Sequence, residues 1–516
     1  MALSSCSSFL EEYSQDQAQV ETWQDLDELL LGDGYWAPSK FQTSSGDINS
    51  MFPMLHFMTD ELKQNENVVD ETQDLLSYKT ALFPYYTWQQ TMCVDEDFEY
   101  VTGDDSYWNS LYKHINTTNM VLSLIDEQPA PTADDLAGRE RVKGEALFLR
   151  ALYYFTLVNL YGAPYDPSTA ATAQAVPVKL TEYVEDKEYV RNTVAEVYEQ
   201  ILADLTEAEK CLDGKERKSV YHANQTAAYL LHSRVCLYMQ NWADAAKYAR
   251  LVLDRQSSLL DLSTLAVGDN SLSKDSPETI FSTGGYLISN IFADYKSYWG
   301  YRIEPYFLIS DDMMQLYSAV DDYRSQLYVG QSEKYAVSPV FTKVSGQRST
   351  WGSYQEVSDC FLFRTPEAYL TLAEASAYAG DEATARTTLE QFLRTRRVTG
   401  SAVTESGHAL IDLIRDERAR EFLLEGHRWY DLRRYTVCQP YPWSKTIEHG
   451  YIYIDNYSID NIAWYRLEEY DKAYTLPIPR EVLDFQNSLG NNDRPARTAF
   501  KTEQPSYDDY DYDYDF

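Results

Sequence analysis

Residues 223–254 read ANQTAAYLLHSRVCLYMQNWADAAKYARLVLD, a stretch with two helical patterns and a short turn between them. It predicts a helix near 223–239, a tight turn at Gln240-Asn241, and a second helix that runs to about Asp254. Ser233 and Ala245 lie twelve positions apart, and small side chains at that spacing let two antiparallel helices approach closely. This arrangement is typical of tetratricopeptide-like helix pairs.

A second stretch repeats the arrangement. A helix near 366–379 meets a turn at Gly380-Asp381, and its partner runs to about Arg397, with Ala373 and Ala385 again twelve apart. Further helices are predicted by their apolar periodicity, near 106–126, over 134–161 and over 191–212. The sequence therefore predicts a mainly α fold, in which tetratricopeptide-like helical pairs form a scaffold.

Other stretches lack helical periodicity. We expect the helical scaffold over about 104–255 and 364–436, and a loop-rich region over about 32–103 and 256–362. Strand-like runs at 278–281 and 359–363 predict short β-hairpins within that region. Loops held by a rigid frame are where binding residues concentrate, so the loop-rich region is expected to carry the ligand site.

Charge and composition exclude several classes of protein. The 516 residues carry a net charge of −37, and such a surface repels nucleic-acid phosphates and anionic lipid headgroups. No apolar stretch of about 18 residues occurs, so no membrane-spanning helix is predicted. The chain holds 44 Tyr, 10 Trp and 19 Phe, and we expect part of this aromatic surplus to contact ligand and the larger part to fill the core.

Cysteine and histidine spacing gives no reason to expect a metal site or a cofactor. The six cysteines are scattered without a CxxC pair, and the seven histidines show no HExxH motif. Cys6 differs from the others because it ends Leu3-Ser4-Ser5-Cys6, which looks like a bacterial lipobox. No charged and apolar leader precedes it, so the sequence is expected to be a mature or truncated form, anchored by acyl chains on Cys6.

Four segments, in order, resemble the SusD/RagB family of outer-membrane nutrient-binding lipoproteins. They begin with Phe9 to Ser14 and Asp25 to Gly32, then Lys143 to Phe155 with Leu160 to Pro164, then Ile414 to Arg434, and finally Leu476 to Glu481 with Asn487, Asn491 and Asn492. The resemblance covers nearly the whole chain. It implies a single SusD-like domain over 15–505. The polar stretch at 1–14 is expected to be the lipoprotein tether, and the alternation of Asp and Tyr at 506–516 marks an acidic tail.

The resemblance also implies a role and partners. Members are non-enzymatic proteins on the extracellular face of the outer membrane, which capture oligosaccharides and deliver them to a SusC/RagA-like TonB-dependent transporter. Family members bind ligand through loops that correspond to two aromatic clusters here, 82–90 and 295–302, and to a third loop near Asp60. The predicted ligand-binding residues are Asp60, Tyr85, Trp88, Tyr286, Trp299, Tyr301 and Trp351, with Trp36 as a further candidate.

The aromatic and charged residues also allow structural roles. Each aromatic residue can equally belong to the core, and the charges from Arg418 to Arg434 are expected to pair along one helix and fix its packing. Peptide capture by a RagB-like protein and a protein-only adaptor are the alternative functions. An enzyme is the weakest reading, because acidic pairs such as Asp311 and Asp312 are adjacent in sequence, whereas a glycosidase needs two carboxylates across a cleft.

Overall fold

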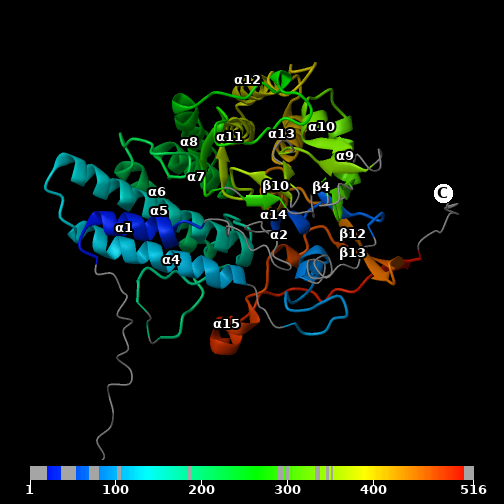
Figure 1. The fold of residues 1–516 in the computed structure, drawn as a ribbon, viewed down its shortest axis with the longest axis horizontal. Coiled ribbons are helices and arrows are strands. Elements are labelled where there is room, and N and C mark those ends of the chain that lie inside the picture. Colours follow the sequence, from blue (N-terminus) through cyan, green and yellow to red (C-terminus); the bar gives the residue numbers. More distant parts are fainter. Residues whose placement is uncertain are drawn as a thin grey trace, which may run out of the picture.

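The structure is a computed structural model of the chain (Figure 1). It describes residues 20–36, 54–68, 81–101, 106–183, 185, 187–284, 286–288, 295–296, 302–303, 305–331, 338–344, 348–349 and 352–504. Side chains are described throughout these ranges except at 106, 286–288, 295–296, 302–303, 348–349 and 352–355.

The mainly α fold class is confirmed, and short strands lie between the helices. The main helices are α1 (Trp23–Leu29), α2 (Met54–Phe57), α4 (Ser106–Leu124), α5 (Ala133–Tyr161), α6 (Val194–Cys211), α7 (Gln225–Tyr238), α8 (Trp242–Arg255), α9 (Asp311–Ser318), α10 (Arg324–Leu327), α11 (Thr365–Tyr378), α12 (Glu382–Leu393), α13 (Gly407–Glu421), α14 (Arg428–Val437) and α15 (Arg480–Phe485). In Figure 1 the long helices α4 to α6 lie together on one side, and α7, α8 and α11 to α13 lie above them.

The strands form small separate sheets. They are β1 (Leu62–Gln64), β2 (Thr279–Ser282), β3 (Tyr286–Ile288), β4 (Tyr295–Lys296), β5 (Arg302–Ile303), β6 (Phe307–Ile309), β7 (Val329–Gln331), β8 (Pro339–Phe341), β9 (Arg348–Ser349), β10 (Gly352–Gln355), β11 (Leu362–Arg364), β12 (Ile447–Asp455), β13 (Ser458–Leu467) and β14 (Lys501–Glu503). The predicted strand-like runs are present as β2 and β11, which pair antiparallel. The longest sheet has the order β12-β13-β14.

Both predicted helix pairs are present, α7 with α8 and α11 with α12. Ser233 and Ala245 are fully buried, and the Ser233 hydroxyl donates a hydrogen bond of 2.8 Å to the Ala245 carbonyl oxygen. Ala373 and Ala385 are fully buried in the same way. Because these side chains are small, the paired helix axes come close enough for a side chain to bond to the backbone opposite.

Helix starts follow from capping residues in the sequence. The Thr132 hydroxyl accepts a hydrogen bond from the backbone N–H of Asp135, and the Asp135 carboxylate accepts one from the Thr132 N–H. Thr193 and Glu196 form the same reciprocal cap on α6. Each cap satisfies backbone donors that would otherwise lack a partner at the first turn.

The charged segment from Arg418 to Arg434 is not one helix, and this corrects the prediction. Helix α13 ends at Glu421, α14 begins at Arg428, and the connecting turn holds Leu424 and Gly426 in left-handed backbone conformations, with φ of 53° and 74°. Left-handed residues end a right-handed helix, so the charges on either side cannot follow one continuous helical face.

These charges instead join distant segments in the core. Glu421 accepts hydrogen bonds from the guanidinium groups of Arg324, Arg364 and Arg396, and all four side chains are buried. Burial alone would raise the pKa of Glu421, but the three arginines outweigh burial and hold that pKa well below its usual range. Other pairs stay within the segment, since Asp431 accepts hydrogen bonds from both Arg418 and Arg434. The predicted packing role of the segment is confirmed, through contacts across the fold as well as within the segment.

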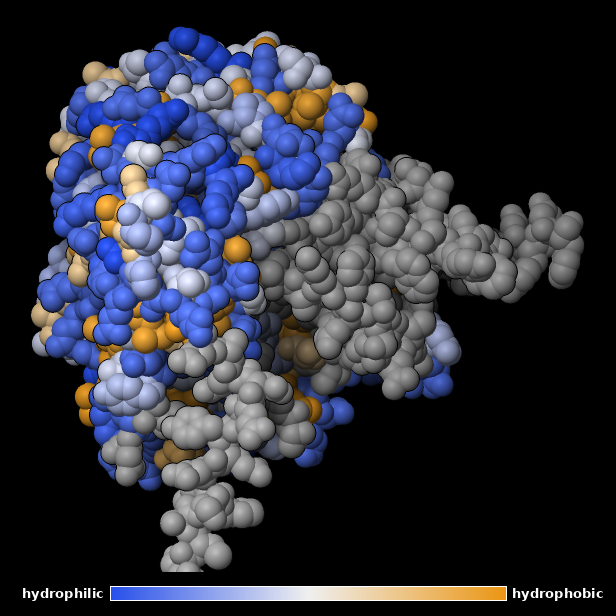
Figure 2. Space-filling model, turned by 60° about the vertical axis from the view of Figure 1, so that its left-hand side comes forward, coloured by the Kyte–Doolittle hydropathy of each residue, from blue (hydrophilic) through white to orange (hydrophobic). Residues whose placement is uncertain are grey.

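The surface is rich in polar side chains. Figure 2 shows a face that is largely hydrophilic, with hydrophobic residues in separate patches. Among the described residues, no helix is long and apolar enough to cross a membrane.

Candidate functional site

A polar cleft of about 390 Å³ opens where β1, the start of α9 and the β12–β13 hairpin meet. Sequence-distant segments build it, because β1 pairs with β6, which leads directly into α9. Its polar lining residues are Asp60, Lys63, Gln64, Glu66, Ser310, Asp311, Asp312, Thr446, Glu448 and His449, and Tyr86 and Trp464 add aromatic surface.

Asp60 lies at the base of this cleft and is tied in place by two cations. Its two carboxylate oxygens accept hydrogen bonds of 2.7 Å from Arg428 of α14, and one of them also accepts a 2.8 Å bond from Lys445. Burial would raise the pKa of Asp60, but Arg428 and Lys445 outweigh burial and hold it well below its usual range. Asp60 is therefore a buried carboxylate at every pH near neutrality.

The rim of the cleft carries exposed charges. Lys63 pairs with Asp311 at 2.7 Å, and the Asp311 side chain is 85% exposed. Lys445 bridges from the buried Asp60 to Asp312, which is also at the rim. Asp311 and Asp312 face solvent, so they are able to exchange a protein partner for a ligand hydroxyl at small cost.

Trp464 supplies the aromatic surface of the hairpin side. On the hairpin face that lines the cleft, Gly450 pairs with Trp464 and Ile452 with Ile462. A Cβ atom at Gly450 would lie 3.3 Å from the indole ring and 3.0 Å from Ile462, so glycine at 450 leaves the space that the ring occupies. The indole N–H donates a 2.7 Å hydrogen bond to Glu503 of β14, which fixes the ring.

The other face of the hairpin packs into the core through His449. Its ring stacks between Tyr86 and Trp88, at centroid distances of 4.1 and 4.3 Å. Its two ring nitrogens contact the carbonyl oxygens of Tyr86 and Thr59 at 2.7 and 2.8 Å. Burial lowers the pKa of His449 to about 4, against the opposing effect of the two carbonyl oxygens.

The structure gives the predicted residues of the 82–90 cluster packing roles. Trp88 is fully buried, and its indole N–H donates a 2.9 Å hydrogen bond to the Met58 carbonyl oxygen. Tyr85 is 8% exposed within the same core, so neither ring presents a face to the cleft. The physical reason is the hairpin, which covers this segment and inserts His449 against it. Asp60 is the one predicted residue that lines the cleft.

The remaining predictions fall elsewhere. Tyr286 lies in β3, where only the backbone is described, and Trp299, Tyr301, Trp351 and Cys6 lie outside the described residues. Trp36 is partly buried and stacks on His114, with ring centroids 4.9 Å apart. Ligand contact by these residues stays a prediction.

Sequence reasoning missed Trp464. The available signal was the alternation of side chains between the two faces of β12 and β13. Once the strand register is known, this alternation places Gly450, Ile452, Ile462 and Trp464 on one face. When a glycine lies opposite a tryptophan in a hairpin, the glycine has no side chain, so the indole ring can lie over the neighbouring backbone.

Comparison with protein families identifies the chain. A family model described as starch-binding and associating with the outer membrane matches residues 37–237. The SusD family model matches residues 293–494. The chain belongs to the SusD/RagB family. The resemblance found in the sequence is thereby confirmed.

Solved structures of SusD-type proteins share this fold. A SusD superfamily protein from Bacteroides vulgatus is 18% identical, with a TM-score of 0.69, over 92% of this chain and 100% of that one. A SusD-like carbohydrate binding protein from the same organism is 20% identical (TM-score 0.65; 91% and 97% covered). A laminarin binding SusD-like protein is 18% identical (TM-score 0.56; 81% and 92% covered). A search of curated proteins finds no match.

Proposed function

We propose that the protein captures oligosaccharides at the bacterial surface and that the cleft between Asp60 and Trp464 contacts them. The main support for this proposal is that the half-buried indole of Trp464 and a set of hydrogen-bonding side chains line one cleft. A pyranose ring has an apolar face, which suits the indole, and a rim of hydroxyls, which suits carboxylate and ammonium partners. Membership of the SusD/RagB family supports carbohydrate binding in general.

The charge of the cleft lining indicates which class of sugar it can bind. Five carboxylates line the cleft, those of Asp60, Glu66, Asp311, Asp312 and Glu448. Four cations pair with them, namely Lys63, Arg428, Lys445 and Arg466, so the carboxylates remain in excess by one charge. An excess of carboxylates disfavours an anionic ligand, because like charges repel and desolvation of both is costly. We therefore expect neutral glycans in preference to uronate-rich or sulfated ones. The laminarin binding relative is consistent with this choice.

Delivery belongs to the same proposal. Family relatives associate with the outer membrane, and a lipid on Cys6 would hold the protein there while it passes glycan to a TonB-dependent transporter barrel without cleaving it. Incorporation of a labelled fatty acid that is lost in Cys6→Ser, measured with a lipoprotein signal peptide fused ahead of the chain, tests the anchor. Co-purification with the barrel tests the partner.

Binding is tested first by affinity electrophoresis and calorimetry against neutral glucans, uronate-rich polysaccharides and peptides. Selective retention by a neutral glycan supports the proposal. Retention by peptides alone would favour the peptide-capture alternative, for which the exposed carboxylates Asp311 and Asp312 offer partners for an ammonium group. Retention by nothing, with the barrel absent and present, would favour a protein-only adaptor.

A further inference from the structure

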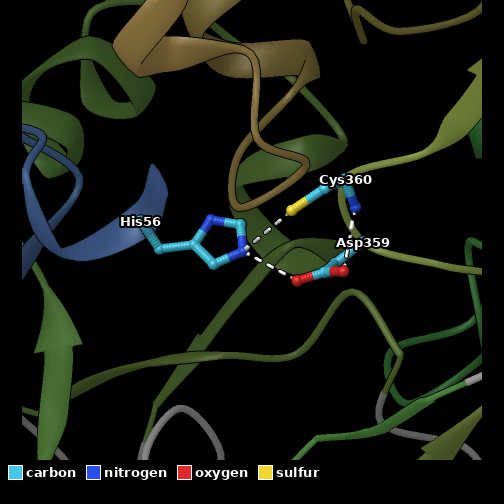
Figure 3. A group of neighbouring side chains, drawn as sticks. All are labelled: His56, Asp359 and Cys360. Atoms are coloured by element: carbon cyan, nitrogen blue, oxygen red, sulfur yellow. Dashed lines mark hydrogen bonds and ion pairs between the residues drawn. The ribbon is translucent and has the colours of Figure 1, made fainter. Parts of the chain in front are cut away.

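Three side chains that can bind a metal meet in the core, and none of them lines the cleft. His56 comes from α2, and Asp359 and Cys360 come from the segment just before β11. All three are buried, with exposed fractions of 1%, 1% and 9%. The His56 Nε2 atom lies 3.0 Å from Asp359 Oδ2 and 3.9 Å from Cys360 Sγ, and the three candidate ligand atoms all lie within 4.8 Å of one another (Figure 3).

These separations are close to those of a tetrahedral zinc site. Zn²⁺ binds imidazole nitrogen and carboxylate oxygen at about 2.0–2.2 Å and thiolate sulfur at about 2.3 Å, which places neighbouring ligand atoms roughly 3.3–3.7 Å apart. A nitrogen, an oxygen and a sulfur ligand form a mixed set that suits Zn²⁺ better than Ca²⁺ or Mg²⁺, which prefer oxygen alone. Small rotations of the three side chains would therefore bring them onto one ion.

The geometry argues against a nucleophilic cysteine. In a Cys-His-Asp triad, the histidine lies between its partners, and its two ring nitrogens face opposite sides. Here the same nitrogen, Nε2, faces both the carboxylate and the sulfur, as Figure 3 shows. Convergence of three ligand atoms on one point is the arrangement of a metal site. Burial of Cys360 also leaves a substrate no direct approach to the sulfur.

Neighbouring backbone groups support the arrangement. The second Asp359 oxygen, Oδ1, accepts a 2.9 Å hydrogen bond from the Cys360 backbone N–H, which orients the carboxylate with Oδ2 toward His56. Such bonds typically hold metal ligands in place. Gly426, in the turn between α13 and α14, packs over Cys360, and a Cβ atom there would lie 3.1 Å from the sulfur. The turn therefore covers the sulfur closely and shields it from solvent.

We propose that His56 Nε2, Asp359 Oδ2 and Cys360 Sγ bind one Zn²⁺ ion, with a water molecule or a protein oxygen as the fourth ligand. Binding converts the Cys360 thiol to a thiolate and releases its proton to solvent. The ion would join α2 to the segment just before β11. His56 and Cys360, which come from these two segments, are 304 residues apart in the chain. It would thus stabilise the scaffold beside the cleft, and this inference does not rest on the proposed function.

The test uses the full chain, stripped of metal with a chelator and then titrated with Zn²⁺ alone. We expect one tightly bound equivalent in calorimetry and a rise in the thermal midpoint that excess chelator reverses, because an ion that binds only the folded state stabilises it. Replacement by Co²⁺ should give a sulfur-to-cobalt charge-transfer band in the near ultraviolet. This spectrum needs no variant, so it stays informative even if a substitution prevents folding.

Variants separate the site from binding elsewhere on an acidic protein. Cys360→Ser and His56→Gln should lose the cobalt band and the shift in midpoint, and the matched control Cys438→Ser, another buried thiol, should keep both. An adventitious ion only, with zinc binding but no sulfur-to-cobalt band in the unmodified chain, would overturn the proposal. Equal zinc affinity in Cys360→Ser and the unmodified chain would overturn it as well.

Discussion

The aromatic segment 82–90 and the hairpin of β12 and β13 border the same cleft, but their tryptophans lie in opposite surroundings. Trp88 is fully buried and stacks on His449, whereas Trp464 is half-buried and lines the cleft. Their neighbours decide the difference: the hairpin covers Trp88, and Gly450 leaves room for Trp464. Aromatic density along a sequence thus does not identify which ring a ligand can reach.

The largest effect is expected from Trp88→Ala. Removal of a fully buried indole leaves a cavity in the core, and such changes cost about 3–5 kcal/mol of unfolding free energy. Urea denaturation measures this loss. A variant that kept its stability and lost only glycan affinity would show that Trp88 is a ligand platform after all, and the comparison would fail.

Asp60→Asn should destabilise the protein by about 3 kcal/mol, because it leaves Arg428 and Lys445 buried or half-buried without their carboxylate. Denaturation by urea measures the change, with Asp311→Asn as the matched control. Asp311 is exposed at the cleft rim, so its loss should cost less than about 1 kcal/mol. If the two variants lost similar amounts of unfolding free energy, Asp60 would not differ from Asp311 in its structural role, and the cleft would not have a rigid base and an exposed rim.

Acid should weaken the fold through the same groups. The pKa of the Asp60 carboxyl is held well below its unfolded value of about 3.8, so its stabilisation is complete above that pH and is lost as pH falls further. Glu421 acts in the same direction below about 4.5. We expect a thermal midpoint that begins to fall below about pH 6.5, where the unfolded chain protonates His449 first, and that falls more steeply below about pH 4, with a shallower fall in this lower range in Asp60→Asn. An equally steep fall in that variant would exclude Asp60 as a contributor.

The smallest effect is expected at the rim. Lys63→Ala removes an exposed pair with Asp311 and should change stability by less than about 1 kcal/mol. It should weaken glycan binding only a few-fold, because a solvated ammonium group gains little when it exchanges water for a sugar hydroxyl. Calorimetry checks both statements. If Lys63→Ala lost as much affinity as Trp464→Ala, the rim rather than Trp464 would be the main contact for the glycan.

Sequence reasoning worked where structure is local. The small pairs Ser233 with Ala245 and Ala373 with Ala385 predicted close helix packing because their spacing follows from one turn and two adjacent helices. It was wrong in expecting one continuous helix from Arg418 to Arg434, where the turn at Gly426 interrupts the helix and charges such as Arg428 pair with distant residues. Trp464 depends on strand register, and the cluster of His56 with Cys360 depends on contacts between residues 304 positions apart, so neither is visible in local patterns.

We expect neutral glycan to bind in the cleft at Trp464. The direct measurement is a calorimetric titration of a neutral oligosaccharide into the unmodified chain, Trp464→Ala and Tyr457→Ala, with thermal midpoints as a check on folding. Tyr457 is 68% exposed at the turn of the same hairpin and does not line the cleft. We predict that Trp464→Ala loses about 2 kcal/mol of binding free energy, roughly 30-fold in affinity, while Tyr457→Ala binds normally. Unchanged affinity in a folded Trp464→Ala would contradict the account.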